Sequence, residues 1–203
     1  MSRTNERPGD GAAGAEDLHA EEVNEHLVER MVADDLAWEE WRQLLKLPRK
    51  DADRIHKYLR VLQQRVGFAE PILLRIADHL YIVRAADGRV VKCDCGHAFG
   101  DYRVNWKLGA LVHVRETAAS IAEVYRRENF APEPGWSEVR EYYCPGCATQ
   151  LCVEVVPPGY PPIFEFLPNL DTFYRDWLGQ PLADAAPDWF EDRTRRVTAG
   201  WRD

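Results

Sequence analysis

The sequence predicts an α+β fold in three parts: an N-terminal helical region, a β-rich module, and an extended C-terminal arm rich in aromatic residues and proline. Three observations lead to this prediction. Apolar residues recur at helical spacing in the first third of the chain, strand-like runs fill the middle, and proline interrupts the last part. Two close pairs of cysteines also lie in the β-rich middle.

We expect the 203 residues to divide into four segments. They are a disordered tail over residues 1–18, a helical region over 19–78, a β-rich module with the cysteines over 79–156, and the C-terminal arm with short helices over 157–203. The tail is polar and lacks the apolar segment of a secretory signal. No stretch approaches the roughly 20 apolar residues that span a bilayer, so we expect a cytoplasmic protein without a membrane partner.

The helical region contains two runs with helical periodicity. Residues 21–47 lack glycine and proline and predict one or two helices that end at Pro48. In residues 51–67, apolar side chains follow the i, i+4, i+7 and i+11 pattern of an amphipathic helix. Residues 70–79 are ambiguous, and we expect a short helix that starts at Pro71.

The middle of the chain favours strands. Residues 80–93 form two β-rich runs around an Ala-Asp-Gly turn, which predicts a hairpin. Residues 110–117 alternate like a strand, and residues 118–129 are typical of a short helix. Residues 136–144 and 150–156 read as strands on either side of the second cysteine pair.

The C-terminal arm is expected to run extended and then form a short helix from Asp171 to Leu178, with Gly179 beyond its end. Its large rings are Tyr160, Phe164, Phe166, Phe173, Tyr174 and Trp177. This number of aromatic side chains requires burial, either against the rest of this chain or against another protein. We therefore expect the protein to work in a complex.

The cysteines carry the strongest chemical signal. Cys144 and Cys147 enclose Pro-Gly, a spacing that lets two thiolates converge on one metal ion. Cys93 and Cys95 offer the two further sulfurs that a tetrahedral zinc ion requires. Because each pair lies beside predicted strands, two hairpins would hold one ion, as in a zinc ribbon. A site closed by four thiolates stabilises a fold and leaves no open position for catalysis.

Alternatives to this site remain open. The tight first pair leaves room for His97 or His113 to replace one cysteine as a ligand. An iron–sulfur cluster or a redox pair of Cys144 and Cys147 would use the same thiols. Cys152 alternates with strand neighbours and is expected to be a buried core thiol.

Composition and missing motifs limit the function. The formal charge is −8. An acidic chain is not expected to bind nucleic acid, because such binding relies on basic patches that neutralise phosphates. The sequence has no phosphate-binding loop, no nucleophile elbow and no His-Glu-x-x-His motif, so we expect no catalytic residue on this chain. The runner-up hypothesis is a nucleic-acid-binding zinc-ribbon protein, which would need a basic face despite the acidic total, and the third is a redox protein.

Four motifs in combination suggest a family. They are Cys-x-Cys-Gly-His from Cys93, "DYR-x-NWK" over 101–107, "REYYCPGC" over 140–147 and "PPGYP" over 157–161. With these motifs, about half of the chain resembles the small, zinc-containing γ-type subunit of the acetone carboxylase family. The small subunit of acetophenone carboxylase is a relative in that family.

This resemblance implies a role in a large hetero-oligomer that uses ATP to join a ketone and bicarbonate into a β-keto acid. It implies that the larger, hydantoinase-like subunits carry the nucleotide, any Mn²⁺ or Mg²⁺, and the chemistry. By motif match, Cys93, Cys95, Cys144 and Cys147 would bind Zn²⁺ in a structural, non-catalytic subunit of this ligase. Acetone, acetophenone and other ketones remain open as the substrate.

Overall fold

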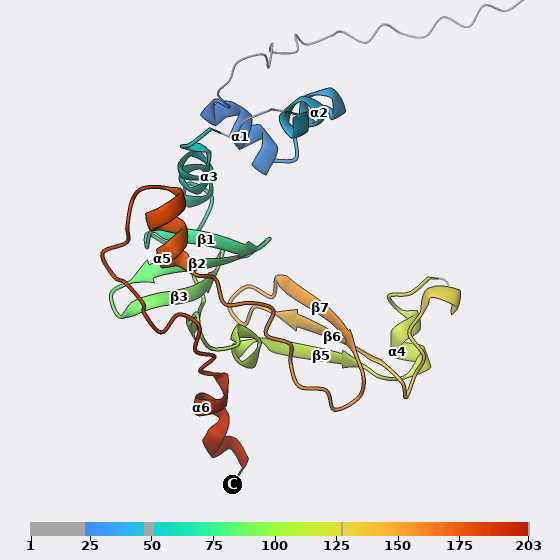
Figure 1. The fold of residues 1–203 in the computed structure, drawn as a ribbon. Coiled ribbons are helices and arrows are strands. Elements are labelled where there is room, and N and C mark those ends of the chain that lie inside the picture. The colour runs from blue at the N-terminus through green and yellow to red at the C-terminus, as the bar shows by residue number, and fades with distance from the viewer. Residues whose placement is uncertain (1–22, 47–50, 127, 203) are drawn as a thin grey trace, which may run out of the picture. The chain divides into compact units, whose positions relative to one another are not determined.

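A computed structural model describes residues 23–46, 51–126 and 128–202 (Figure 1). The chain divides into two units, one ending at Val61 and the other beginning at Leu62. The predicted disordered tail lies outside the described residues, and the four segment boundaries stay predictions. Within the described ranges, no helix is long and apolar enough to cross a membrane.

The first unit is helical, as the sequence predicts. Helices α1 (Glu25–Val32) and α2 (Trp38–Lys46) occupy the first predicted run, and α3 (Arg54–Gln63) occupies the second. The Asn24 side chain begins α1 by accepting a hydrogen bond of 2.8 Å from the backbone N–H of Leu27. This bond satisfies one of the backbone donors that every helix start leaves unpaired.

A small apolar core and a two-bond ion pair help to hold the first unit together. The buried apolar residues are Val23, Leu27, Val28, Leu44 and Val61. Arg30 donates to both carboxylate oxygens of Glu40, at 2.7 and 2.8 Å, and Glu40 also accepts from the backbone N–H of Ala37. This two-bond pair joins α1 to α2 in a fixed orientation.

The second unit begins with a four-stranded antiparallel sheet, here called sheet A. Its strands follow chain order: β1 (Ile72–Ala77), β2 (Leu80–Ala85), β3 (Gly88–Cys93) and β4 (Ala98–Asp101). The predicted hairpin is confirmed, because β2 and β3 pair from Leu80 opposite Cys93 to Ala85 opposite Gly88. The pairing therefore places Cys93 at the last position of β3.

The short helix predicted to start at Pro71 is wrong, because residues 72–77 form strand β1. β1 pairs with β2 and buries Ile72 and Leu73. Two irregularities interrupt its register, between Ile72 and Leu74 and between Arg75 and Ala77. Such bulges break the two-residue alternation by which a strand is recognised in a sequence.

A second antiparallel sheet, here called sheet B, contains the other predicted strands. β6 (Glu138–Tyr143) lies between β5 (Leu111–Arg115) and β7 (Gln150–Val156). The short elements around the two sheets are η1 (Trp106–Gly109), α4 (Ala118–Ala122), η2 (Glu128–Phe130), α5 (Leu170–Thr172), η3 (Phe173–Trp177), α6 (Thr194–Thr198) and η4 (Ala199–Arg202). The predicted C-terminal helix thus corresponds to α5 and the π-helical η3, and Gly179 follows with a positive φ of 66°.

Residues 157–202, here called the C-terminal segment, contribute to the core of the second unit. Leu170 and Tyr174 are buried in one apolar cluster with residues of sheet A, such as Leu73 and Leu80. The Tyr174 hydroxyl donates to the carbonyl of Leu73 at 2.8 Å, so even its polar atom is paired. The extended course of the arm and the zinc-ribbon likeness stay predictions, since the fold itself establishes only the mixed α and β architecture and the cysteine cluster.

Candidate metal centre

The first cysteine pair lies in the turn between β3 and β4. The backbone N–H of Cys93 donates to the carbonyl of His97 at 2.9 Å, and that of Gly96 donates to the carbonyl of Cys93 at 2.8 Å. Gly96 has a φ of 92°, which a residue with a side chain rarely adopts. These bonds form a tight turn after β3. The turn brings Cys93 and Cys95 close together, although only one residue separates them.

The second pair lies in the turn between β6 and β7. Cys144 donates its backbone N–H to the carbonyl of Thr149 at 2.9 Å, and Ala148 donates to the carbonyl of Cys144 at 2.8 Å. The backbone N–H of Gly146 lies 3.4 Å from Cys144 Sγ and donates to it. This contact places one backbone donor beside a candidate ligand sulfur.

The two turns place all four sulfurs together. The Sγ atoms of Cys93, Cys95, Cys144 and Cys147 all lie within 4.8 Å of one another. The Cys93–Cys147 and Cys95–Cys144 pairs are each separated by 3.7 Å. No disulfide joins these thiols, and this group could hold a metal ion.

The four thiols do not have equal environments. Cys93 and Cys144 are buried, whereas Cys95 and Cys147 are exposed. Burial raises the pKa of Cys93 and also that of Cys95. A hydrogen bond with the Thr149 hydroxyl, 3.2 Å away, lowers the pKa of Cys147 to about 6. Desolvation thus opposes the thiolates of Cys93 and Cys95, and a bound cation would supply the compensating charge.

The histidines considered as alternative ligands do not join the group. Over the ranges that the structure describes, the cluster consists of the four cysteines alone. The His97 ring packs against Phe99 with a centroid distance of 4.9 Å. His113 is exposed on β5, where its register partner is Glu141 of β6. Cys152, expected in the core, is only half-buried and lies beside Glu165.

A second cluster of polar side chains was not predicted from the sequence. Lys107 is fully buried and donates to Glu154, to Glu165 and to the carbonyl of Ile163. Glu154 also accepts from the Tyr142 hydroxyl at 3.0 Å. The ammonium group occupies the space between the carboxylates, so this cluster is an ion-pair network. The sequence offers one indication of this network. Glu154 lies at a position of β7 where the alternation of the strand places a side chain in the interior.

Comparison with known proteins identifies the family. A model of the acetone carboxylase gamma subunit family matches residues 66–178, more than half of the chain. The chain belongs to this family. Its match includes both cysteine pairs and also Lys107, Glu154 and Glu165.

Two relatives in this family have established names. The chain is 42% identical over 146 residues to the acetone carboxylase gamma subunit of Xanthobacter autotrophicus, covering 71% of this chain and 86% of the relative. It is 35% identical over 112 residues to the acetophenone carboxylase beta subunit of Aromatoleum aromaticum, covering 55% of this chain and 80% of that protein. The two relatives are thus subunits of carboxylases named for two different ketones.

Proposed function

We propose that this chain is a zinc-binding, non-catalytic subunit of a hetero-oligomeric, ATP-dependent ketone carboxylase. The convergence of four cysteine sulfurs, within a family of carboxylase subunits, is the observation that carries the proposal. The assigned ligands are Cys93, Cys95, Cys144 and Cys147. Zinc would supply folding free energy here by joining the turn after β3 to the turn after β6.

The donor set and its spacing support zinc. A tetrahedral site with Zn–S bonds of about 2.3 Å has sulfur–sulfur edges of about 3.8 Å. The two closest pairs lie 3.7 Å apart, close to this edge. Four thiolates fill all four positions of a tetrahedral ion, which leaves none for a substrate or an activating water.

Exposed apolar side chains support a role inside a complex. Leu111 of β5 and Val153 and Val155 of β7 are about half exposed, and the strand pairing places them on the same face of sheet B. Trp136 and Trp177 are more exposed still, at 79% and 78%. Apolar groups of this size and number favour contact with another protein. We assign that contact to the larger, hydantoinase-like subunits, on which ATP and the reacting ketone would bind.

The test compares the chain alone with the chain co-purified with its partner subunits. We expect about one zinc ion per chain in both preparations, with four thiols protected from alkylation. Ketone- and bicarbonate-dependent ATP hydrolysis is expected only when the larger subunits are present. Turnover by the isolated chain would refute the accessory role, and a metal-free chain in an active complex would refute the zinc site.

A pair of cysteine variants tests the ligand assignment. Cys144→Ser removes one ligand, so we expect loss of most of the zinc and a lower melting temperature, because the site's contribution to folding is lost. Cys152→Ser is the matched control, because Cys152 lies outside the cluster, and it should retain the zinc. Equal zinc content and melting temperature in Cys144→Ser and the wild type would contradict the assignment.

A further inference from the structure

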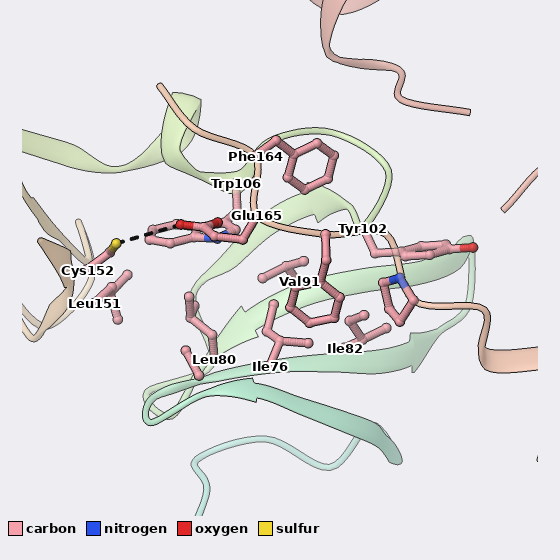
Figure 2. A pocket seen from close by; sticks show the side chains of 13 residues that line it. Ile76, Leu80, Ile82, Val91, Tyr102, Trp106, Leu151, Cys152, Phe164 and Glu165 are labelled. Carbon is pink, nitrogen blue, oxygen red and sulfur yellow. Dashed lines mark hydrogen bonds between the residues drawn. The ribbon is translucent and has the colours of Figure 1, made fainter. Parts of the chain in front are cut away.

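The second unit contains a cavity that neither the metal centre nor the proposed role uses. It has a volume of about 200 Å³ and lies between sheet A and residues 164–168 of the C-terminal segment (Figure 2). Its floor consists of Ile76 from β1, Ile82 from β2 and Val91 from β3. Three neighbouring strands therefore present aliphatic side chains to one partly open cavity.

Aromatic side chains line the remaining sides of the cavity. Phe164 and Phe166 of the C-terminal segment are among its lining residues, together with Tyr102 and Trp106. Figure 2 labels Phe164, Tyr102 and Trp106. Aromatic rings interact favourably edge to face, at centroid distances of about 4.5–7 Å. A flat aromatic ligand would therefore lie among side chains with which contacts of this kind can form.

The polar groups at the cavity determine which charge it accepts. Cys152 Sγ lies 3.8 Å from Glu165 Oε1 at one end of the space (Figure 2). Burial raises the pKa of Cys152, which keeps the thiol neutral, and Lys107 is already paired with Glu165. Among the described residues that line the cavity, none is a lysine, arginine or histidine. An anionic ligand would meet the Glu165 carboxylate, while the neighbouring cation, Lys107, is already shared between Glu165 and Glu154.

The size of the cavity limits the ligand. An apolar cavity of about 150 Å³, engineered into another protein, stays dry and binds benzene. A volume of about 200 Å³ fits one six-membered ring with a short substituent. Apolar side chains around an empty space lose dispersion contacts, and a ligand of matching shape restores them.

We propose that this cavity is a binding site for a small uncharged aromatic molecule, a single ring with a short substituent. The site is separate from the four cysteines and does not depend on the presence of zinc or on the carboxylase role. Its ligand is held by apolar contacts with sheet A and with the aromatic residues of the C-terminal segment. Anionic analogues of the same size are disfavoured at the Glu165 end.

The test uses the full-length chain with toluene as the probe and benzoate as a charged probe of similar size. Toluene is expected to bind saturably, to raise the melting temperature and to shift the methyl resonances of Ile82 and Val91. The exposed methyl groups of Val153 should not shift. Benzoate is expected to produce neither effect. Absence of toluene binding, or equal binding of benzoate, would overturn the proposal.

Two variants that fill the cavity make the test specific. Ala77→Leu and Ile76→Phe add volume at positions that line the space, so each should weaken toluene binding about tenfold or more. Ala119→Leu adds the same group as Ala77→Leu at an exposed position of α4 and should leave binding unchanged. Unchanged binding in the filled variants would show that toluene binds elsewhere. If both variants fail to fold, the methyl shifts of the wild type decide the question alone.

Discussion

At the scale of single residues, Gly146 shows how closely the two cysteine turns approach each other. A Cβ atom added there would lie 3.1 Å from the Cβ of His97 and 3.2 Å from Cys95 Sγ. Both neighbours belong to the turn that carries the first cysteine pair. Because Gly146 has no side chain, the two turns can approach this closely.

Gly146→Ala should therefore destabilise the metal centre. We expect a loss of about 1–3 kcal/mol in unfolding free energy, the usual cost of overpacking, together with weaker zinc binding. Urea denaturation and zinc competition with a chelator measure the two effects. Gly200→Ala is the matched control, because a Cβ at Gly200 would meet nothing within 4 Å, and its stability should stay close to that of the wild type.

Lys107 is a second residue whose role depends on its surroundings. Burial would lower its pKa, but its hydrogen bonds to Glu154 and Glu165 raise that pKa above the usual value, so the side chain remains a cation. Its head group also lies 5.4 Å from the centroid of the Tyr142 ring. This single cation joins η1 and sheet B to the C-terminal segment.

Lys107→Met should leave the buried Glu154 carboxylate and the partly exposed Glu165 carboxylate without their shared cation. The expected cost is about 3–5 kcal/mol of unfolding free energy, as for other buried ion pairs that lose one member. Lys107→Met combined with Glu154→Gln should recover part of this loss, because one of the two charges is removed. Urea denaturation of both variants gives the comparison, and an equal loss in both would argue against the ion-pair explanation.

At the scale of elements, charged side chains fasten the C-terminal segment to sheet A. Arg89 of β3 has a side chain that is only 2% exposed, and it pairs with Asp171 and Asp184 of the segment. Arg84 of β2 also pairs with Asp184, at 3.0 Å. The attachment therefore combines the apolar contacts of Leu170 and Tyr174 with buried, charge-assisted hydrogen bonds.

This attachment should weaken at low pH. Burial would raise the pKa of Asp184, but the hydrogen bond and charge of Arg89, together with the charge of Arg84, lower it below its usual value. A carboxylate with a lowered pKa stabilises the fold fully above the unfolded-state pKa of about 3.9. Its contribution is lost as the pH falls through the folded-state value.

The difference in unfolding free energy between the wild type and Asp184→Asn should thus be largest at neutral pH and shrink below about pH 4. Urea denaturation between pH 7 and pH 3 measures it. Asp87→Asn, at an exposed turn between β2 and β3, should show no such change. A constant difference for Asp184→Asn across this range would contradict the ion-pair account.

At the scale of the whole molecule, the residues that the structure describes form two apolar cores. One forms around Leu27 and Val28, and the other forms around Leu80 and Ile82. The four cysteines all belong to the second unit. Each unit buries its own apolar residues, so we expect each to respond separately when metal is removed.

Chelation of the metal should therefore affect only one unit. We expect hydrogen exchange in β3 and β6 to become about tenfold faster or more, because the turns that follow them lose their cross-link. Amides of α1 and α2 should retain their protection. Exchange followed by mass spectrometry, with and without a chelator, distinguishes the regions. Equal loss of protection in α1 would show that the units do not open independently.

The local elements were largely predictable because their signals are local. Helical spacing predicts α1 to α3, and the turn between two β-rich runs predicts the hairpin of β2 and β3. Strand β1 was missed because its bulges break the alternation. The four cysteines were predicted together from their spacing, and the fold brings them together.

The sequence alone determined most helices and strands other than β1, the family and the four cysteines that meet, because periodicity and motif spacing are properties of short stretches of chain. Only the tertiary structure decided which long-range contacts form. The pairing of Arg89 with Asp171, the burial of Lys107 between two glutamates, and the cavity under Phe166 all join residues far apart in sequence. No local pattern encodes these contacts, since each arises only when packed elements leave a polar group or a space to be filled.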